Sequence, residues 1–79
     1  MPPSPPDQEA LGRAVRELRR ERGWTQEVLA ERASLHWTYI GGIERGVRNP
    51  TWTNVGKLAG ALEIRLSELV ARAESLAEG

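Results

Sequence analysis

The chain has 79 residues, of which 39% are hydrophobic and none is cysteine, and its formal net charge at pH 7 is zero. This length supports one small domain and excludes a second, while the missing thiols exclude disulfides and cysteine-based metal sites. Because the chain has neither a signal-peptide pattern nor an apolar run of the roughly 20 residues that span a bilayer, we expect a cytoplasmic protein.

The N-terminal segment differs in composition from the rest of the chain. Residues 1–6 contain four prolines and little apolar surface, so we expect a disordered, Pro-rich arm. The arm has no arginine or lysine to hold a phosphate, which argues against a role in a DNA groove. A single domain is predicted over residues 7–79. It begins with a helix that ends at Gly23, and the apolar side of that helix, at helical spacing, consists of Leu11, Ala14, Val15 and Leu18.

Two short helical patterns follow, separated by a tight turn. The first is predicted over about residues 26–33, with Thr25 as its N-cap. The second is predicted over about residues 37–45, where Gly46 ends it. Residues 25–45 therefore predict a helix-turn-helix. A helix that exposes its first side chains while a second helix braces its back has the geometry that enters the DNA major groove.

The remaining residues predict two more helices. Thr51 can cap the fourth, and the apolar stripe of this helix comprises Trp52, Val55, Leu58, Ala59 and Leu62. We expect Trp52, like Trp24, in the core or in an interface. A break at residues 63–65 precedes a C-terminal helix over residues 66–77. No β-type alternation occurs, so the predicted fold class is all-α, a compact five-helix bundle.

The C-terminal helix has more apolar positions than the edge of so small a bundle should need. These positions are Leu66, Leu69, Val70, Ala73 and Leu76. We expect them to form a homodimer interface, because operators that are read by a helix-turn-helix commonly come as paired half-sites. The alternative is that these residues pack inward and that the last turn frays.

Charge is unevenly distributed along the chain. Residues 11–50 contain eight arginines and five glutamates, a net charge of +3, whereas residues 1–10 carry −2 and residues 51–79 carry −1. Positive charge therefore coincides with the predicted helix-turn-helix, as contact with a phosphate backbone requires. The competing interpretation is a solvated helix surface with ordinary salt bridges.

The markers of a known family are spread over residues 11–70. They are Arg16, Leu18 and Arg19; Thr25-Gln26-Glu27 with Leu29-Ala30; and Ile40, Ile43-Glu44-Arg45-Gly46 and Asn49-Pro50. On these residues the chain resembles the phage-repressor and Cro type of helix-turn-helix transcriptional regulator, the XRE family. Residues 36–49 are most similar to the controller proteins of restriction-modification systems, which are homodimers that bind paired operator sites. The resemblance implies a sequence-specific, DNA-binding regulator with its third helix in the major groove.

Candidate DNA base contacts lie at the exposed start of the third helix. They are Trp37, Thr38 and Tyr39. Thr38 can hydrogen-bond a base edge or touch a thymine methyl, and Tyr39 offers a hydroxyl and a flat ring. Trp37 stands where related controllers commonly have arginine, and its single N–H cannot make arginine's two hydrogen bonds to guanine. For Trp37, stacking, contact with thymine methyls and folding back over the domain all remain open.

Candidate phosphate contacts lie at two helix starts and just after the third helix. They are Thr25, Gln26, His36, Arg45, Arg48 and Asn49. For Thr25 and His36, helix capping or a plain surface position is an alternative of equal or greater weight. Gln26 and Arg48 are also supported by the resemblance, because the matching family residues contact DNA.

Three residues inside the third helix have expected roles other than direct contact. Gly41 and Gly42 each cost up to about 1 kcal/mol relative to alanine, so we expect either DNA or another helix to approach the backbone closely there. In the family that the chain resembles, the position of Gly42 often carries a side chain that contacts bases. We therefore expect fewer direct base contacts and more dependence on DNA shape. Glu44 is expected to form a salt bridge with Arg16 or Arg19, as the matching family residues do.

Other classes of function have less support. One histidine and dispersed carboxylates assemble no catalytic pair, metal cluster or phosphate loop, so we expect no enzyme, metal, cofactor or small-molecule ligand. The main alternative is an antitoxin, or another protein-interaction module, that binds a partner polypeptide through its C-terminal helix. The neutral net charge suits that alternative.

Overall fold

The computed structural model describes residues 6–79, which form five helices and no strand. The helices are α1 (Gln8–Glu21), α2 (Gln26–Ala33), α3 (Trp37–Glu44), α4 (Trp52–Ala61) and α5 (Leu66–Glu78). The predicted all-α, five-helix fold is confirmed, and α3 and α5 each end one residue from their predicted ends. Apart from Pro6, the predicted Pro-rich arm lies outside the described residues.

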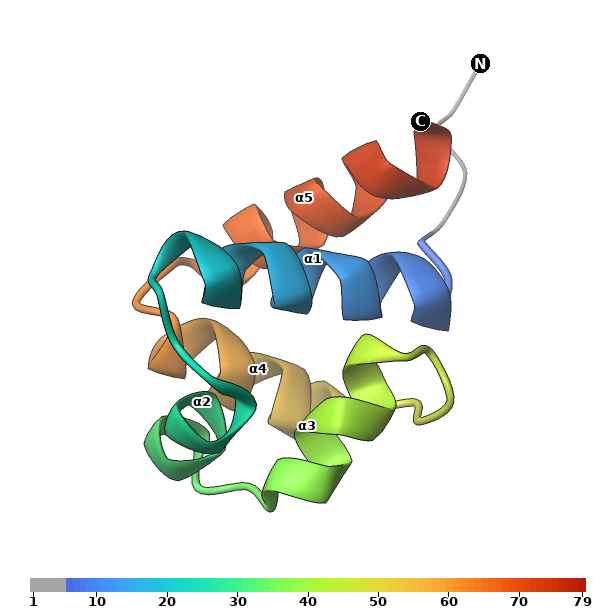
Figure 1. Ribbon diagram of the computed structural model, residues 1–79. Helices are drawn as coiled ribbons and strands as arrows, with labels where there is room; N and C mark the ends of the chain where they lie inside the picture. The colour runs from blue at the N-terminus through green and yellow to red at the C-terminus, as the bar shows by residue number, and fades with distance from the viewer. Residues whose placement is uncertain (1–5) are drawn as a thin grey trace.

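The two helices that are farthest apart in the sequence lie side by side. α5 packs along α1, and on the other side of α1 lie α3, α2 and α4 (Figure 1). α2 contacts both α3 and α4, and α4 also contacts α5. The C-terminal helix therefore closes the bundle, and the α2–α3 pair lies on the side that is opposite to α5.

Every helix contributes to one core. The largest fully buried side chains are Val15, Leu29, Ile40, Ile43, Leu58, Leu62 and Leu69, and burial of each stabilises the fold by about 1.5–3 kcal/mol. Trp52 corrects the predicted stripe of α4, because 72% of this residue is exposed. It is the first residue of α4, at the end of the stripe, and it lines an open hollow instead of the core.

The turn between α2 and α3 is short because Ser34 adopts a left-handed conformation, with φ 57°. The Thr25 hydroxyl caps α2 by accepting a hydrogen bond from the Val28 N–H (3.2 Å), and Thr51 caps α4 in the same way at the Asn54 N–H (3.1 Å). Both caps satisfy N–H groups that have no partner within the helix. Residues 25–44 thus form the predicted helix-turn-helix.

A glycine allows α1 to lie directly on the end of α3. Gly12 is buried, and a Cβ on it would overlap the carbonyl oxygen of Ile43 and lie 2.9 Å from that of Glu44. Backbone therefore meets backbone at this crossing. The contact fixes the C-terminal end of α3 and leaves its N-terminal end to project from the bundle.

Two of the five residues in the predicted dimer interface are already used inside the single chain. Leu69 is 0% exposed and Ala73 is 1% exposed, and both belong to the core. The prediction is corrected for these two, since α5 needs them to pack on the bundle. Leu66, Val70 and Leu76 are only partly buried and keep some exposed apolar surface.

Candidate nucleic-acid interface

The N-terminal turn of α3 is the exposed part of that helix. His36 is its N-cap, and the Nδ1 of the imidazole accepts the Thr38 N–H at 3.2 Å and lies 2.7 Å from the Thr38 hydroxyl oxygen. Because Nδ1 accepts the backbone N–H, it is the unprotonated ring nitrogen, and the Thr38 hydroxyl donates to it. The capping role is therefore present, and the remaining N–H of His36, on Nε2, can still donate to an anion.

The three candidate base contacts differ in exposure. Thr38 is exposed, and Trp37 is 51% exposed with its ring stacked on that of His36, at a centroid distance of 6.0 Å. Tyr39 is half-buried against the core, and its hydroxyl accepts a hydrogen bond from Asn54 Nδ2 at 3.1 Å. Trp37 and Thr38 thus face solvent, while the ring of Tyr39 connects α3 to α4.

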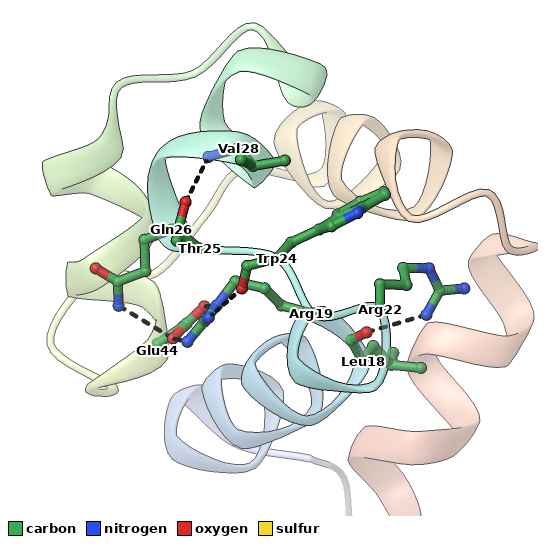
Figure 2. Close-up of polar contacts among 8 residues, drawn as sticks. All are labelled: Leu18, Arg19, Arg22, Trp24, Thr25, Gln26, Val28 and Glu44. Carbon is green, nitrogen blue, oxygen red and sulfur yellow. Dashed lines mark hydrogen bonds and ion pairs between the residues drawn. The ribbon is translucent and has the colours of Figure 1, made fainter.

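The other end of α3 is held by a buried ion pair. Arg19 donates to Glu44 twice, from Nε at 2.7 Å and from Nη2 at 2.9 Å, and Arg19 Nη1 donates to the Trp24 carbonyl at 2.7 Å. The Glu44 hydrogen bonds raise the pKa of Arg19 further above its ordinary value. Figure 2 shows Arg19 from α1 and Gln26 from α2 converging on Glu44. The pair joins α1 to α3, and Gln26 adds α2. The partner of Glu44 is therefore Arg19 and not the exposed Arg16.

The start of α2 lies beside this ion pair. The Gln26 amide donates from Nε2 to Glu44 Oε1 at 3.1 Å, so its side chain is directed toward α3 (Figure 2). Thr25 is exposed, and its hydroxyl is engaged in the cap of α2. A phosphate at this helix end would therefore meet backbone N–H groups and the second N–H of the Gln26 amide, because only one bond from Nε2 goes to Glu44.

The loop after α3 carries the other candidate phosphate contacts. Arg45, Arg48 and Asn49 are all exposed. The N–H groups of Val47 and Arg48 both donate to the Gly42 carbonyl, at 3.0 and 3.1 Å, and this folds the loop back onto the end of α3. The loop therefore displays two arginines on a fixed backbone beside α3.

The glycines of α3 are buried under side chains, one of which comes from α2. A Cβ on Gly41 would approach side-chain atoms of Gln26 and Arg45, and one on Gly42 would meet the stem of Arg48. At Gly41 a side chain of α2 takes the place of an approaching helix, and at Gly42 the stem of Arg48 covers the backbone. A close approach of DNA to these glycines stays a prediction.

No helix of residues 6–79 has both the length and the apolar character that a membrane crossing requires. The same residues contain no group of three or more histidine, cysteine, aspartate or glutamate side chains that could hold a metal ion.

A family model described as helix-turn-helix matches residues 15–69. The match covers more than half of the chain and includes all of α2, α3 and α4. The chain belongs to the helix-turn-helix family. The resemblance to the phage-repressor and Cro type of regulator is thereby confirmed.

Helix-turn-helix relatives include repressors and controller proteins. The immunity repressor of Bacillus phage phi105 is 40% identical over 60 residues, which are 76% of this chain but only 42% of the repressor. The restriction-modification controller protein C.AhdI from Aeromonas hydrophila is 45% identical, with a TM-score of 0.77 over 78% of this chain and 94% of C.AhdI. The controller C.Esp1396I, solved as a tetramer with its natural 35 base-pair operator, is 31% identical, with a TM-score of 0.76 over 86% and 93% of the two chains.

Sequence reasoning missed two residues that shape this helix-turn-helix. Asn54 orients the Tyr39 hydroxyl, and Gly12 lets α1 contact the end of α3. Their partners lie 15 and more than 30 positions away in the sequence. Spacing within one helix carries no signal of such contacts.

Proposed function

We propose that this chain is a DNA-binding transcriptional regulator that binds paired operator half-sites as a homodimer, with α3 in the major groove. The observation that carries the proposal is the exposed first turn of α3, on a helix whose second half is buried and tied to α1 and α2. A rigid helix with free N-terminal side chains is the element that reads base edges in the major groove.

The candidate contacts divide by their position on this surface. Trp37 and Thr38 enter the groove first, where the threonine hydroxyl can turn from His36 to a base edge. Arg45, Arg48 and Asn49 follow the phosphate backbone, and the N-terminus of α2 with Thr25 and Gln26 receives a second phosphate. Tyr39 reaches DNA only with the outer part of its ring or with its hydroxyl, because the rest packs inward.

A second copy of this chain is the partner that best fits the remaining apolar surface. A hollow of 480 Å³ opens between α1, α4 and α5, and its lining includes Leu11, Val55 and Val70, with the exposed Trp52 beside them. In a twofold interface, each Trp52 can enter the hollow of the other copy, because both features lie on the same face. The assembly of C.Esp1396I as a tetramer on its operator supports self-association.

The proposed biological role is that of a restriction-modification controller in the cytoplasm, without catalysis or a cofactor. C.AhdI and C.Esp1396I support this role, since both are restriction-modification controllers and both are covered over more than nine-tenths of their length. The proposed role requires operator binding and dimerisation but no chemistry.

The decisive test is selection of bound duplexes from a random DNA pool with the purified chain. We expect two symmetric half-sites about one helical turn, ~34–36 Å, or a multiple of it apart. Thr38→Ala should relax the choice at one base position, while Arg48→Ala should weaken binding to all sequences about equally. No enrichment at low salt would refute DNA binding and favour a protein-interaction module. A single, asymmetric half-site would refute the dimer.

A further inference from the structure

Gly42 lies in the middle of α3, where glycine destabilises a helix relative to alanine, so the absence of a side chain there needs a structural reason. Glycine is less favourable than alanine in a helix interior because it loses more backbone freedom on folding. Nevertheless Gly42 is buried, although it lies four residues after the exposed Thr38 and so on the same face of the helix. Something from outside the helix therefore occupies the space above it.

The side chain of Arg48 fills that space. A Cβ on Gly42 would lie 2.5 Å from Cγ, 3.3 Å from Cβ and 3.7 Å from Cδ of Arg48. The backbone of Arg48 is fixed to the same residue, because its N–H donates to the Gly42 carbonyl at 3.1 Å. The aliphatic stem of Arg48 is thus seated on the bare backbone of α3.

The charged end of Arg48 is left for another molecule. Within residues 6–79, its guanidinium forms no hydrogen bond or ion pair, and Arg48 as a whole is exposed. Because its stem is held along α3, Arg48 has already lost side-chain rotamers that a free surface arginine would lose only on binding. Binding of an anion beside α3 then costs less side-chain entropy.

We propose that Gly42 is a positioning residue for DNA binding, which seats Arg48 along α3 and aims its guanidinium at the DNA. This inference rests on the proposed function, in which the face of α3 docks on DNA. A methyl group at position 42 would collide with Cγ of Arg48, close to its hydrogen-bonded backbone, so the stem of Arg48 must move and the melting temperature of Gly42→Ala is measured beside its affinity. The displaced arginine should then bind DNA less well.

The experiment titrates a duplex carrying the selected operator with the wild-type chain, Gly42→Ala, Arg48→Ala and the double variant. We expect Gly42→Ala to weaken binding about tenfold in the wild-type background and less than about twofold in the Arg48→Ala background. Gly60→Ala is the matched control, because Gly60 is an exposed helical glycine with open space where a Cβ would be placed. It should raise the melting temperature and leave the affinity unchanged.

The outcomes separate the inference from the proposed function. If Arg48→Ala binds as tightly as the wild type, the docking face itself is wrong. If Arg48→Ala weakens binding but Gly42→Ala does not, or if the two losses of binding free energy add fully, the positioning role of Gly42 is refuted while DNA binding stands. NMR relaxation of the Arg48 Nε–H in the wild-type chain is a test that needs no folded variant. A side chain as mobile as the exposed Arg16 would also overturn the inference.

Discussion

Removal of the Glu44 carboxylate should destabilise this domain more than any change on its surface. Arg19 and Glu44 are buried together, with side chains that are 10% and 3% exposed. Glu44→Ala leaves the Arg19 guanidinium in place without its counter-charge and removes the acceptor of Gln26 as well. Breaking a buried pair in this way costs about 3–5 kcal/mol.

That cost is large for a chain of this size. At roughly 0.05–0.15 kcal/mol per residue, the whole domain is stable by only about 4–12 kcal/mol. With a slope of about 1 kcal/mol/M, the urea midpoint should fall by about 3–5 M, which brings a domain at the low end of that range close to unfolding in water. Urea titration followed by far-UV circular dichroism measures the midpoint directly.

A paired replacement tests whether the unpaired charge is the cause. Arg19→Leu with Glu44→Leu removes both charges, and such exchanges are often neutral or stabilising. Trp24 and Gln26 are both partly exposed, so water can then form the hydrogen bonds that the Trp24 carbonyl and the Gln26 amide lose. We expect the double variant to recover most of the loss. A loss of less than about 1 kcal/mol in Glu44→Ala, or no recovery in the double variant, would refute this reasoning.

Three further outcomes are expected. Gly12→Ala should lower the melting temperature, with a loss of about 1–3 kcal/mol, because its Cβ would overlap the Ile43 carbonyl that α1 contacts; an unchanged melt would contradict the close crossing. Arg72→Gln should flatten the acid side of the stability–pH curve. The hydrogen bond from Arg72 lowers the pKa of Glu21, so this contribution is present above the unfolded pKa of Glu21 and lost as the pH falls through its folded pKa. The wild type and Arg72→Gln should therefore differ near neutral pH and converge in acid, and equal curves at every pH would contradict this. Trp52→Ser should shift the chain toward the monomer in sedimentation equilibrium at an unchanged melting temperature of the monomer, and an unaltered dimer would exclude Trp52 from the interface.

The helices and their inner faces could be predicted because they depend on neighbours in the sequence. Thr25 and Thr51 cap their helices through hydrogen bonds to N–H groups three residues later, and Gly23 ends α1. Ile40 and Ile43 are buried because they lie three residues apart on one face of α3. Such spacings are visible in the sequence without knowledge of the fold.

The function of individual side chains on the recognition surface depends on partners that are distant in the sequence. Gln26 is predicted to contact a phosphate, and its amide also donates to Glu44, which lies 18 residues away. Tyr39 is predicted to contact DNA, and its hydroxyl also accepts a hydrogen bond from Asn54. Periodicity tells which face of a helix is polar, but it does not tell whether a polar side chain on that face is free or already bonded.

The sequence pattern placed Trp52 in the core or in an interface, and its exposure bears on how two copies of the chain associate. At helical spacing it belongs to the apolar stripe of α4, but as the first residue of that helix it lies beyond the single-chain core. Conversely, Leu69 and Ala73 were assigned to the dimer and serve the core instead. A bundle of this length cannot cover both ends of every apolar stripe. The tryptophan that is left uncovered beside an apolar hollow is therefore where we propose that a second copy binds, so the proposed dimer interface moves from the middle of α5 toward the start of α4.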